Sequence, residues 1–246
     1  MAPFQTSPGP SGSSPKRSLA ATLLPLRYRR SQYALYLAGC VLFAIGATCF
    51  IEAGLGTDPL DVFALGLMNV MPMTVGIAQG GFAALMLALW AGIKREVPSV
   101  WPFITFFFCG SMIDLWLHTG VLGGAPLAVM GAGMLMLAGV ALCSLGSAYI
   151  IMSGIGIRAM DLVAIALVER TGRPFWVFKA VFEVLLLAVG WVLGGPVGIG
   201  TVFFLVFVGF LIQPVMTLNG RLIGLPNYAL PKLDARSRPL VGDEAA

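Results

Sequence analysis

Two aspartates in apolar surroundings are the residues of this chain best suited to chemistry. Asp61 lies in the segment GLGTDPLDVFALGL (residues 54–67), and Asp161 lies in the segment GIGIRAMDLVAIAL (residues 154–167). An ionised side chain inside a bilayer costs about 2.5 kcal/mol or more, so each carboxylate needs a partner or a function. We interpret both as candidate ion- or substrate-binding groups. The alternative is that each only complements the positive end of a short interfacial helix.

A Gly-x-Gly sequence opens each of these two segments and predicts a break in the preceding helix. The glycines are Gly54 and Gly56 in the first segment, and Gly154 and Gly156 in the second. Unwound backbone at such a break can present N–H and C=O groups to an ion or a polar solute. We therefore include the four glycines among the candidate binding residues.

The sequence Asp58-Pro59 predicts a helix start, with Asp58 as the N-cap and proline at the first helical position. A helix over residues 59–70 would be about 18 Å long, which is too short to cross a bilayer. Arg158 stands at the position equivalent to Asp58, so the two segments differ in charge. Arg158 could bind an anion, pair with Asp161, or simply mark the cytoplasmic side.

Lys179 and Glu183 are the next candidates for a binding site. They are four residues apart in an apolar segment, so they share one helix face and can pair. Such a pair can bind a ligand or can be purely structural. Three other polar residues lie within apolar segments, and for these we expect hydrogen bonds between helices: Gln79, Asp114 and Gln213.

The composition places the chain in the membrane class. Hydrophobic residues make up 58% of the 246 residues, charged residues make up 11%, and the mean hydropathy is +0.92. A soluble domain would carry about 25% charged residues. The net charge of +4 comes from basic residues at segment ends and in the tails, so it does not indicate nucleic acid as a partner. No cysteine or histidine spacing suggests a metal site, and we expect no cofactor.

Six apolar segments are long enough to span a bilayer, and two shorter ones follow the Gly-rich breaks. The six predicted spans are residues 33–53, 74–93, 100–118, 128–151, 175–193 and 202–218. The fold class predicted from this pattern is an all-α membrane protein with about six transmembrane helices. A basic tail (1–32) and a polar tail (220–246), both expected to lack fixed structure in whole or in part, would flank the membrane domain.

The sequence of the membrane domain indicates an internal duplication. Residues 37–67 align without a gap at an offset of one hundred, with 11 identities in 31 positions. The repeats would be residues 33–122 and 123–219. Three spans per repeat insert the second repeat upside down, so that Lys94, Arg95 and the basic residues of 158–179 face the same side as both chain ends. That arrangement follows the positive-inside rule, and it predicts two inverted repeats with both termini in the cytoplasm.

The two Gly-rich segments and their surroundings resemble the YczE/YyaS/YitT family of bacterial membrane proteins. The resemblance covers about residues 33–218 and rests on GLGTDPLDV, GIGIRAMDL, the Glu183 helix and the loop LGGPVGIGT. In the family the second segment often reads Pro-Arg-Asp, whereas this chain has Ala159-Met160-Asp161. The resemblance implies an integral protein of the bacterial plasma membrane, and it implies no particular substrate.

We predict a transporter of a small solute or ion that acts within the lipid bilayer and is not an enzyme. A homodimer is one possible assembly, since nothing in the sequence fixes the oligomeric state. The alternatives are a non-transporting membrane scaffold and an intramembrane hydrolase with paired carboxylates. The distance in sequence between the glycines and the aspartate argues against the hydrolase. Intramembrane aspartyl proteases carry Gly-x-Gly-Asp, whereas this chain has further residues between the second glycine and the aspartate.

Overall fold

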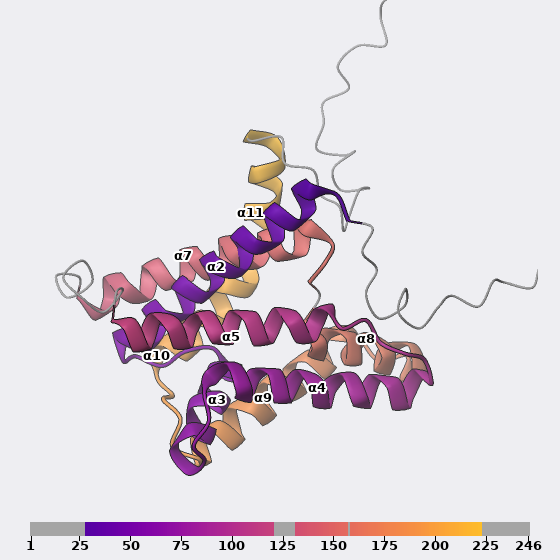
Figure 1. Ribbon diagram of the computed structural model, residues 1–246, viewed down its shortest axis with the longest axis horizontal. Coiled ribbons are helices and arrows are strands. Elements are labelled where there is room, and N and C mark those ends of the chain that lie inside the picture. Colours follow the sequence, from indigo (N-terminus) through magenta and orange to yellow (C-terminus); the bar gives the residue numbers. More distant parts are fainter. Residues whose placement is uncertain (1–27, 121–130, 157, 223–246) are drawn as a thin grey trace, which may run out of the picture.

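A computed structural model describes residues 28–120, 131–156 and 158–222 of the chain. Regular structure in these residues is entirely helical, as predicted (Figure 1). The helices are α2 (Arg30–Ala53), α3 (Pro59–Val70), α4 (Val75–Lys94), α5 (Trp101–Thr119), α7 (Ala132–Ser153), α8 (Ala159–Thr171), α9 (Phe175–Val192), α10 (Ile199–Phe203), the π-helix η1 (Phe204–Val208) and α11 (Gly209–Leu222).

Five helical segments of the described residues are long and apolar enough to cross a membrane. They are α2, α4, α7, α9 and the continuous stretch Ile199–Gly220, which joins α10, η1 and most of α11. Each corresponds to a predicted span. The remaining predicted span, residues 100–118, is the 19-residue helix α5, which is not among the five. Polar side chains such as Thr105 and Asp114 lower the hydropathy of α5, and both bond to other helices.

The predicted breaks and short helices are present. α3 starts at Pro59 and ends at Val70, and α8 has 13 residues. α2 begins at Arg30, so the last three residues assigned to the N-terminal tail are helical. The rest of that tail, the boundary between the two predicted repeats and most of the C-terminal tail lie outside the described residues.

Glycines in the left-handed conformation end α2 and α7. Gly54 has φ 66° and Gly154 has φ 70°, and each donates its N–H to the carbonyl three residues earlier. A residue with a β-carbon is strained at such angles, which explains why glycine stands at both helix ends. After each cap the chain turns into a short helix.

The most extensive contact between two helices joins α2 and α7, which cross in Figure 1. A β-carbon on Gly146 would lie 2.7 Å from the carbonyl oxygen of Gly39, and one on Gly139 would lie 3.0 Å from that of Gly46. The contacts are reciprocal at the offset of one hundred, since Gly39 meets Gly146 and Gly46 meets Gly139. Small residues allow membrane helices to approach this closely.

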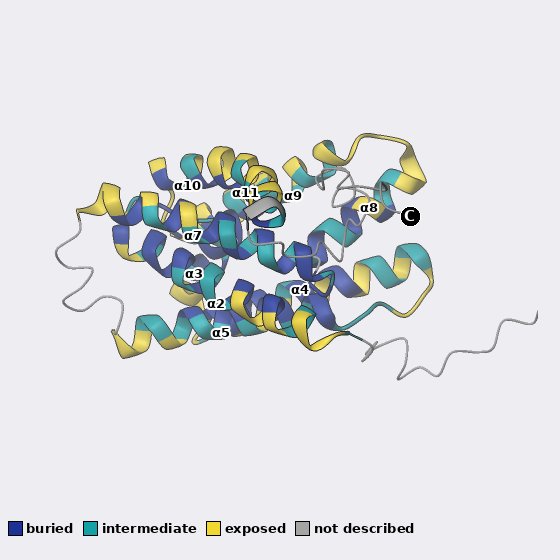
Figure 2. Ribbon diagram, turned by 90° about the horizontal axis from the view of Figure 1, so that it is seen from above, coloured by how far each residue is buried: buried dark blue, intermediate teal, exposed yellow. Residues whose placement is uncertain are grey.

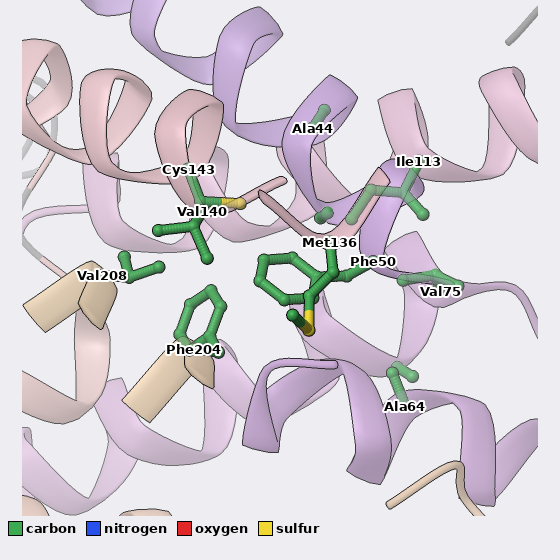
Figure 3. Close-up of a cluster of buried hydrophobic side chains, with 12 residues drawn as sticks. Ala44, Phe50, Ala64, Val75, Ile113, Met136, Val140, Cys143, Phe204 and Val208 are labelled. Atoms are coloured by element: carbon green, nitrogen blue, oxygen red, sulfur yellow. The ribbon is translucent and has the colours of Figure 1, made fainter. Parts of the chain in front are cut away.

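A cluster of buried side chains beside this crossing forms the main apolar core (Figure 3). The ring of Phe50 in α2 meets that of Phe204 in η1 edge-on, with 5.7 Å between the centroids. Val140 and Cys143 of α7 complete the packing around these rings. The core therefore joins residues from both predicted repeats.

α9 and the α10–α11 segment expose much of their apolar surface, as the yellow patches of Figure 2 show. Val192 is 81% exposed, Phe210 is 73% exposed and Trp176 is 69% exposed. Exposed apolar surface of this extent is unfavourable in water but matches a lipid surround.

Candidate functional site

The N-termini of the two short helices meet inside the molecule. Leu60 of α3 packs in one buried cluster with Ala159 and Met160 of α8. From there the helices extend toward opposite ends of the molecule, with α3 on the left and α8 on the right in Figure 1. The N-terminus of a helix carries a partial positive charge, so the junction favours negative groups.

Asp61 lies one turn into α3 and is completely buried. The amide Nε2 of Gln79 in α4 donates to its Oδ1 over 2.6 Å, and the hydroxyl of Thr57 donates to its Oδ2 over 3.3 Å. Both donors are neutral. The hydrogen bond that we expected from Gln79 to another helix is thus confirmed, and its acceptor is Asp61.

Asp161 has a different environment one turn into α8. Arg158, the N-cap residue of α8, donates from Nε to Oδ2 of Asp161 over 2.9 Å and from Nη2 to Oδ1 over 3.4 Å. Their side chains are 35% and 18% exposed respectively. Of the roles considered for Arg158, pairing with Asp161 is therefore confirmed.

Lys179 and Glu183 form the predicted ion pair on α9. The distance between Nζ and Oε1 is 3.7 Å, and both side chains are partly exposed. α9 packs against both α3 and α8, and its Lys179 and Glu183 lie close enough to Asp58 for their charges to act on it.

Asp58 connects these groups. It interacts electrostatically with Arg158, Glu183 and Lys179, and with its neighbour Asp61. We call the resulting set the central charge cluster, and its members come from α8, α9 and the start of α3: Asp58, Asp61, Arg158, Asp161, Lys179 and Glu183. Every charged residue that the sequence proposed for the site belongs to it.

Each break also packs against a threonine of the other repeat. A β-carbon on Gly56 would lie 2.6 Å from the hydroxyl of Thr201, and one on Gly156 would lie 2.9 Å from that of Thr105. Thr105 bonds to the hydroxyl of Tyr36 over 2.8 Å. The buried hydroxyl of Thr201 has no hydrogen-bond partner among the described residues.

The backbone of the first break is held by the first turn of α10. The N–H of Gly200 donates to the carbonyl of Leu55 over 2.7 Å. Gly56 therefore allows close approach of the backbone at Gly198, and Gly156 allows close approach of neighbouring side chains. Gly54 and Gly154 serve as helix caps. A binding role for these four glycines stays a prediction.

The sequence analysis missed the threonines at the breaks, Thr57, Thr105 and Thr201. All three are at most 4% exposed. These threonines could have been found from their position within or beside an apolar segment, because a buried hydroxyl needs a hydrogen-bond partner. Which hydroxyl meets which break depends on long-range packing, so the position of these threonines in the sequence did not reveal it.

The remaining polar residues have structural positions. Asp114 accepts hydrogen bonds from the N–H groups of Val75 and Gly76, both over 2.8 Å, and so caps α4 from the neighbouring helix α5. Gln213 was expected to bond to another helix, but its side chain is exposed on α11. In the described part of the chain no group of histidine, cysteine or acidic residues could hold a metal ion.

The hydrolase alternative requires two carboxylates within hydrogen-bond reach of each other. The hydrogen bonds of Asp61 go to Thr57 and Gln79, and those of Asp161 go to Arg158. Each aspartate thus has its own separate set of partners.

In the described residues all regular structure is helical, and five helical segments are long and apolar enough to cross a membrane, which defines the class, an integral membrane protein. Within that class the chain belongs to the family described as "Family of unknown function (DUF6198)", whose model matches residues 30–217. No solved structure matches the chain.

The chain is similar to three bacterial proteins over nearly the full length of each. The chain is 26% identical to "Uncharacterized protein YyaS" of Bacillus subtilis over 77% of this chain and 94% of the relative. It is 25% identical to "Uncharacterized membrane protein YczE" of the same organism, over 83% and 93% respectively. An "Uncharacterized protein" of Haemophilus influenzae is 23% identical, over 86% and 95%. The resemblance to YczE and YyaS is confirmed, while the link to YitT stays a prediction.

Proposed function

We propose that this protein transports a small solute or ion and that the central charge cluster is its binding site. The observation that carries the proposal is the convergence of six ionisable side chains where two short helices begin. Ionisable groups inside a membrane protein are costly, and they commonly mark a transport pathway. Discontinuous helices whose N-termini point at a central site are a recurring feature of secondary transporters.

The proposed architecture is a pair of inverted repeats with six spans, α5 being the sixth. Three observations support it: the reciprocal glycine contacts of α2 and α7, the threonine that meets each break, and the opposite directions of α3 and α8. Reciprocal contacts of this kind are expected about a two-fold axis. In this arrangement the basic ends of α4 and α8 face the cytoplasm of a bacterial cell, together with both termini.

The charges favour a cationic substrate or coupling ion. The cluster contains four carboxylates and two cations, which gives a formal net charge of −2. Arg158 compensates Asp161 and Lys179 compensates Glu183, whereas Asp61 bonds only to neutral donors among the described residues. A cation or a proton at Asp61 would balance its charge, and the unpaired hydroxyl of Thr201 at the same break is available as a further oxygen ligand.

Flux into proteoliposomes tests the proposal. Purified wild-type protein would be assayed with a panel of labelled monovalent cations, amines and other small polar solutes, beside Asp61→Asn and Asp161→Asn. We expect Asp61→Asn to lower flux of the responsive solute about 100-fold, because the buried carboxylate is removed without a change of size. The matched control is Glu52→Gln, which removes an exposed carboxylate at the end of α2. If no solute moves, or if both aspartate variants match wild type, the proposal fails.

A scaffold without transport is the second candidate, and the bond from Gln79 to Asp61 favours it because this bond joins α4 to α3. The two members of a charge pair with only a structural role should be interchangeable. Exchanging the ion pair by Lys179→Glu with Glu183→Lys would preserve pairing on α9. A scaffold predicts normal folding and partner binding in this double variant, whereas a binding site predicts normal folding with altered flux.

A further inference from the structure

A polar pocket of about 440 Å³ lies between the C-terminal ends of α4 and α8. Residues 92–95 line one wall, and Ala166, Glu169 and Arg170 line the other. The pocket lies at an end of the spanning helix α4, away from the central charge cluster. In a membrane this position is the level of the lipid headgroups.

The pocket carries an excess of positive charge. Its wall holds Lys94, Arg95 and Arg170 but only one acid, Glu169, which pairs with Lys94. Neither Arg95 nor Arg170 has a carboxylate partner among the described residues. An arginine without a carboxylate partner presents a fork of N–H donors that matches the oxygens of a phosphate group.

Arg95 also holds an unusual backbone conformation. It ends α4 with φ 56°, and every other described residue in the left-handed region is a glycine. Gly172 has this role at the end of α8, on the opposite side of the pocket. A glycine at residue 95 would relieve this strain, so the backbone conformation at the end of α4 does not by itself account for an arginine there.

We propose that this pocket binds the phosphate group of an anionic phospholipid. Basic pockets between transmembrane helices are a known kind of headgroup site. The C-terminal ends of α4 and α8 bear partial negative charge, so the attraction must come from the arginine and lysine side chains. The proposal requires only that the chain spans a membrane, and it holds whether or not the protein transports a solute.

Lipid titration of the full-length protein in neutral detergent tests the proposal. Short-chain phosphatidylglycerol, short-chain phosphatidylcholine and inorganic phosphate would each be added, with binding followed by native mass spectrometry and by the shift in thermal unfolding. The variant Arg95→Gly with Arg170→Gln removes both arginines that lack a carboxylate partner and leaves the backbone at residue 95 unstrained. The matched control is Arg173→Gln, which removes an exposed arginine close by in the chain that does not line the pocket.

The expected result is that wild type prefers phosphatidylglycerol at least 10-fold over phosphatidylcholine. The double variant should lose this preference about 10-fold, and Arg173→Gln should change it less than 2-fold. Equal binding of phosphatidylglycerol by the double variant would overturn the proposal, and so would equal loss in the control. Inorganic phosphate that binds as tightly as the lipid would overturn the assignment to a lipid. Should the double variant fail to fold, Arg170→Gln alone must show the same loss of preference.

Discussion

The two Gly-rich breaks begin from similar sequences but place their aspartates in different surroundings. Asp61 is fully buried and bonds to two neutral donors, whereas Asp161 is 18% exposed and pairs with an arginine. One substitution in sequence, Asp58 against Arg158, accounts for much of the difference. The comparison shows that two similar segments compensate their carboxylates differently, one with an arginine at the start of its own helix and the other, among the described residues, with neutral donors alone.

The two short helices, α3 and α8, also differ in how they pack against their neighbours. α3 lies against α9 with backbone contact, because a β-carbon on Gly190 would come within 2.7 Å of the backbone of Val62 and Phe63. α8 lies against α4, where the open polar pocket separates the helix ends. The short helix with the buried aspartate thus has close backbone contact with its neighbour, whereas the other short helix borders an open pocket at its C-terminal end.

The largest effect is expected from adding volume at each helix contact. Gly190→Val should destabilise the protein by about 3 kcal/mol, since the rigid backbone of α3 cannot move away. Gly92→Val, at the wall of the pocket, should cost about 1 kcal/mol or less because a β-carbon there would meet nothing within 4 Å. Thermal unfolding in detergent measures both. Equal losses in the two variants would show that the packing difference does not exist.

An intermediate effect is expected from removing the partner of each aspartate. Gln79→Leu leaves the buried carboxylate of Asp61 without its shorter hydrogen bond and should cost about 2–3 kcal/mol. Arg158→Leu should cost about 1 kcal/mol, because solvent screens the partly exposed Asp161.

The double variant Gln79→Leu with Asp61→Leu serves as the control for this comparison, because removing both partners of a buried pair should recover much of the loss. Unfolding curves for the single and double variants measure these losses of stability. The interpretation is wrong if Arg158→Leu is the more damaging single change.

The smallest effect concerns the helix caps on either side of the pocket. Arg95→Gly should stabilise the protein by about 1 kcal/mol, and Gly172→Ala should destabilise it by about 1 kcal/mol, since a residue with a β-carbon is strained at positive φ. The two melting temperatures should therefore move in opposite directions. A loss of stability in Arg95→Gly would mean that the arginine side chain makes contacts worth more than the strain.

Much of the local structure was predictable from residue types. Apolar runs of about twenty residues predicted the spans, and Asp58-Pro59 predicted the start of α3 at the correct residue. The spacing of four between Lys179 and Glu183 indicated an ion pair that the structure contains, and pairing with Asp161 was one of the three roles considered for Arg158. These features depend only on helix geometry and on the caps of a single segment.

Other features could not be predicted, because they depend on contacts between distant segments. The π-helix at Phe204–Val208 lies inside the predicted span 202–218, where no residue type indicates an interruption. Gln213 was expected to face another helix and is exposed instead, since α11 packs mainly against α7 and presents that side outward. The unpaired hydroxyl of Thr201 beside Gly56 joins residues about 145 positions apart.

The sequence by itself determined that this chain is a helical membrane protein with two glycine-broken segments, because hydropathy, left-handed glycines and helix periodicity act within about twenty residues. Tertiary structure alone decided that Asp58 lies near Glu183 and that Asp61 is buried while Asp161 is not. The physical reason is that burial and electrostatic environment depend on which helices pack together. That packing was set here by glycine contacts and by a junction of two helix N-termini, and no single segment encodes it.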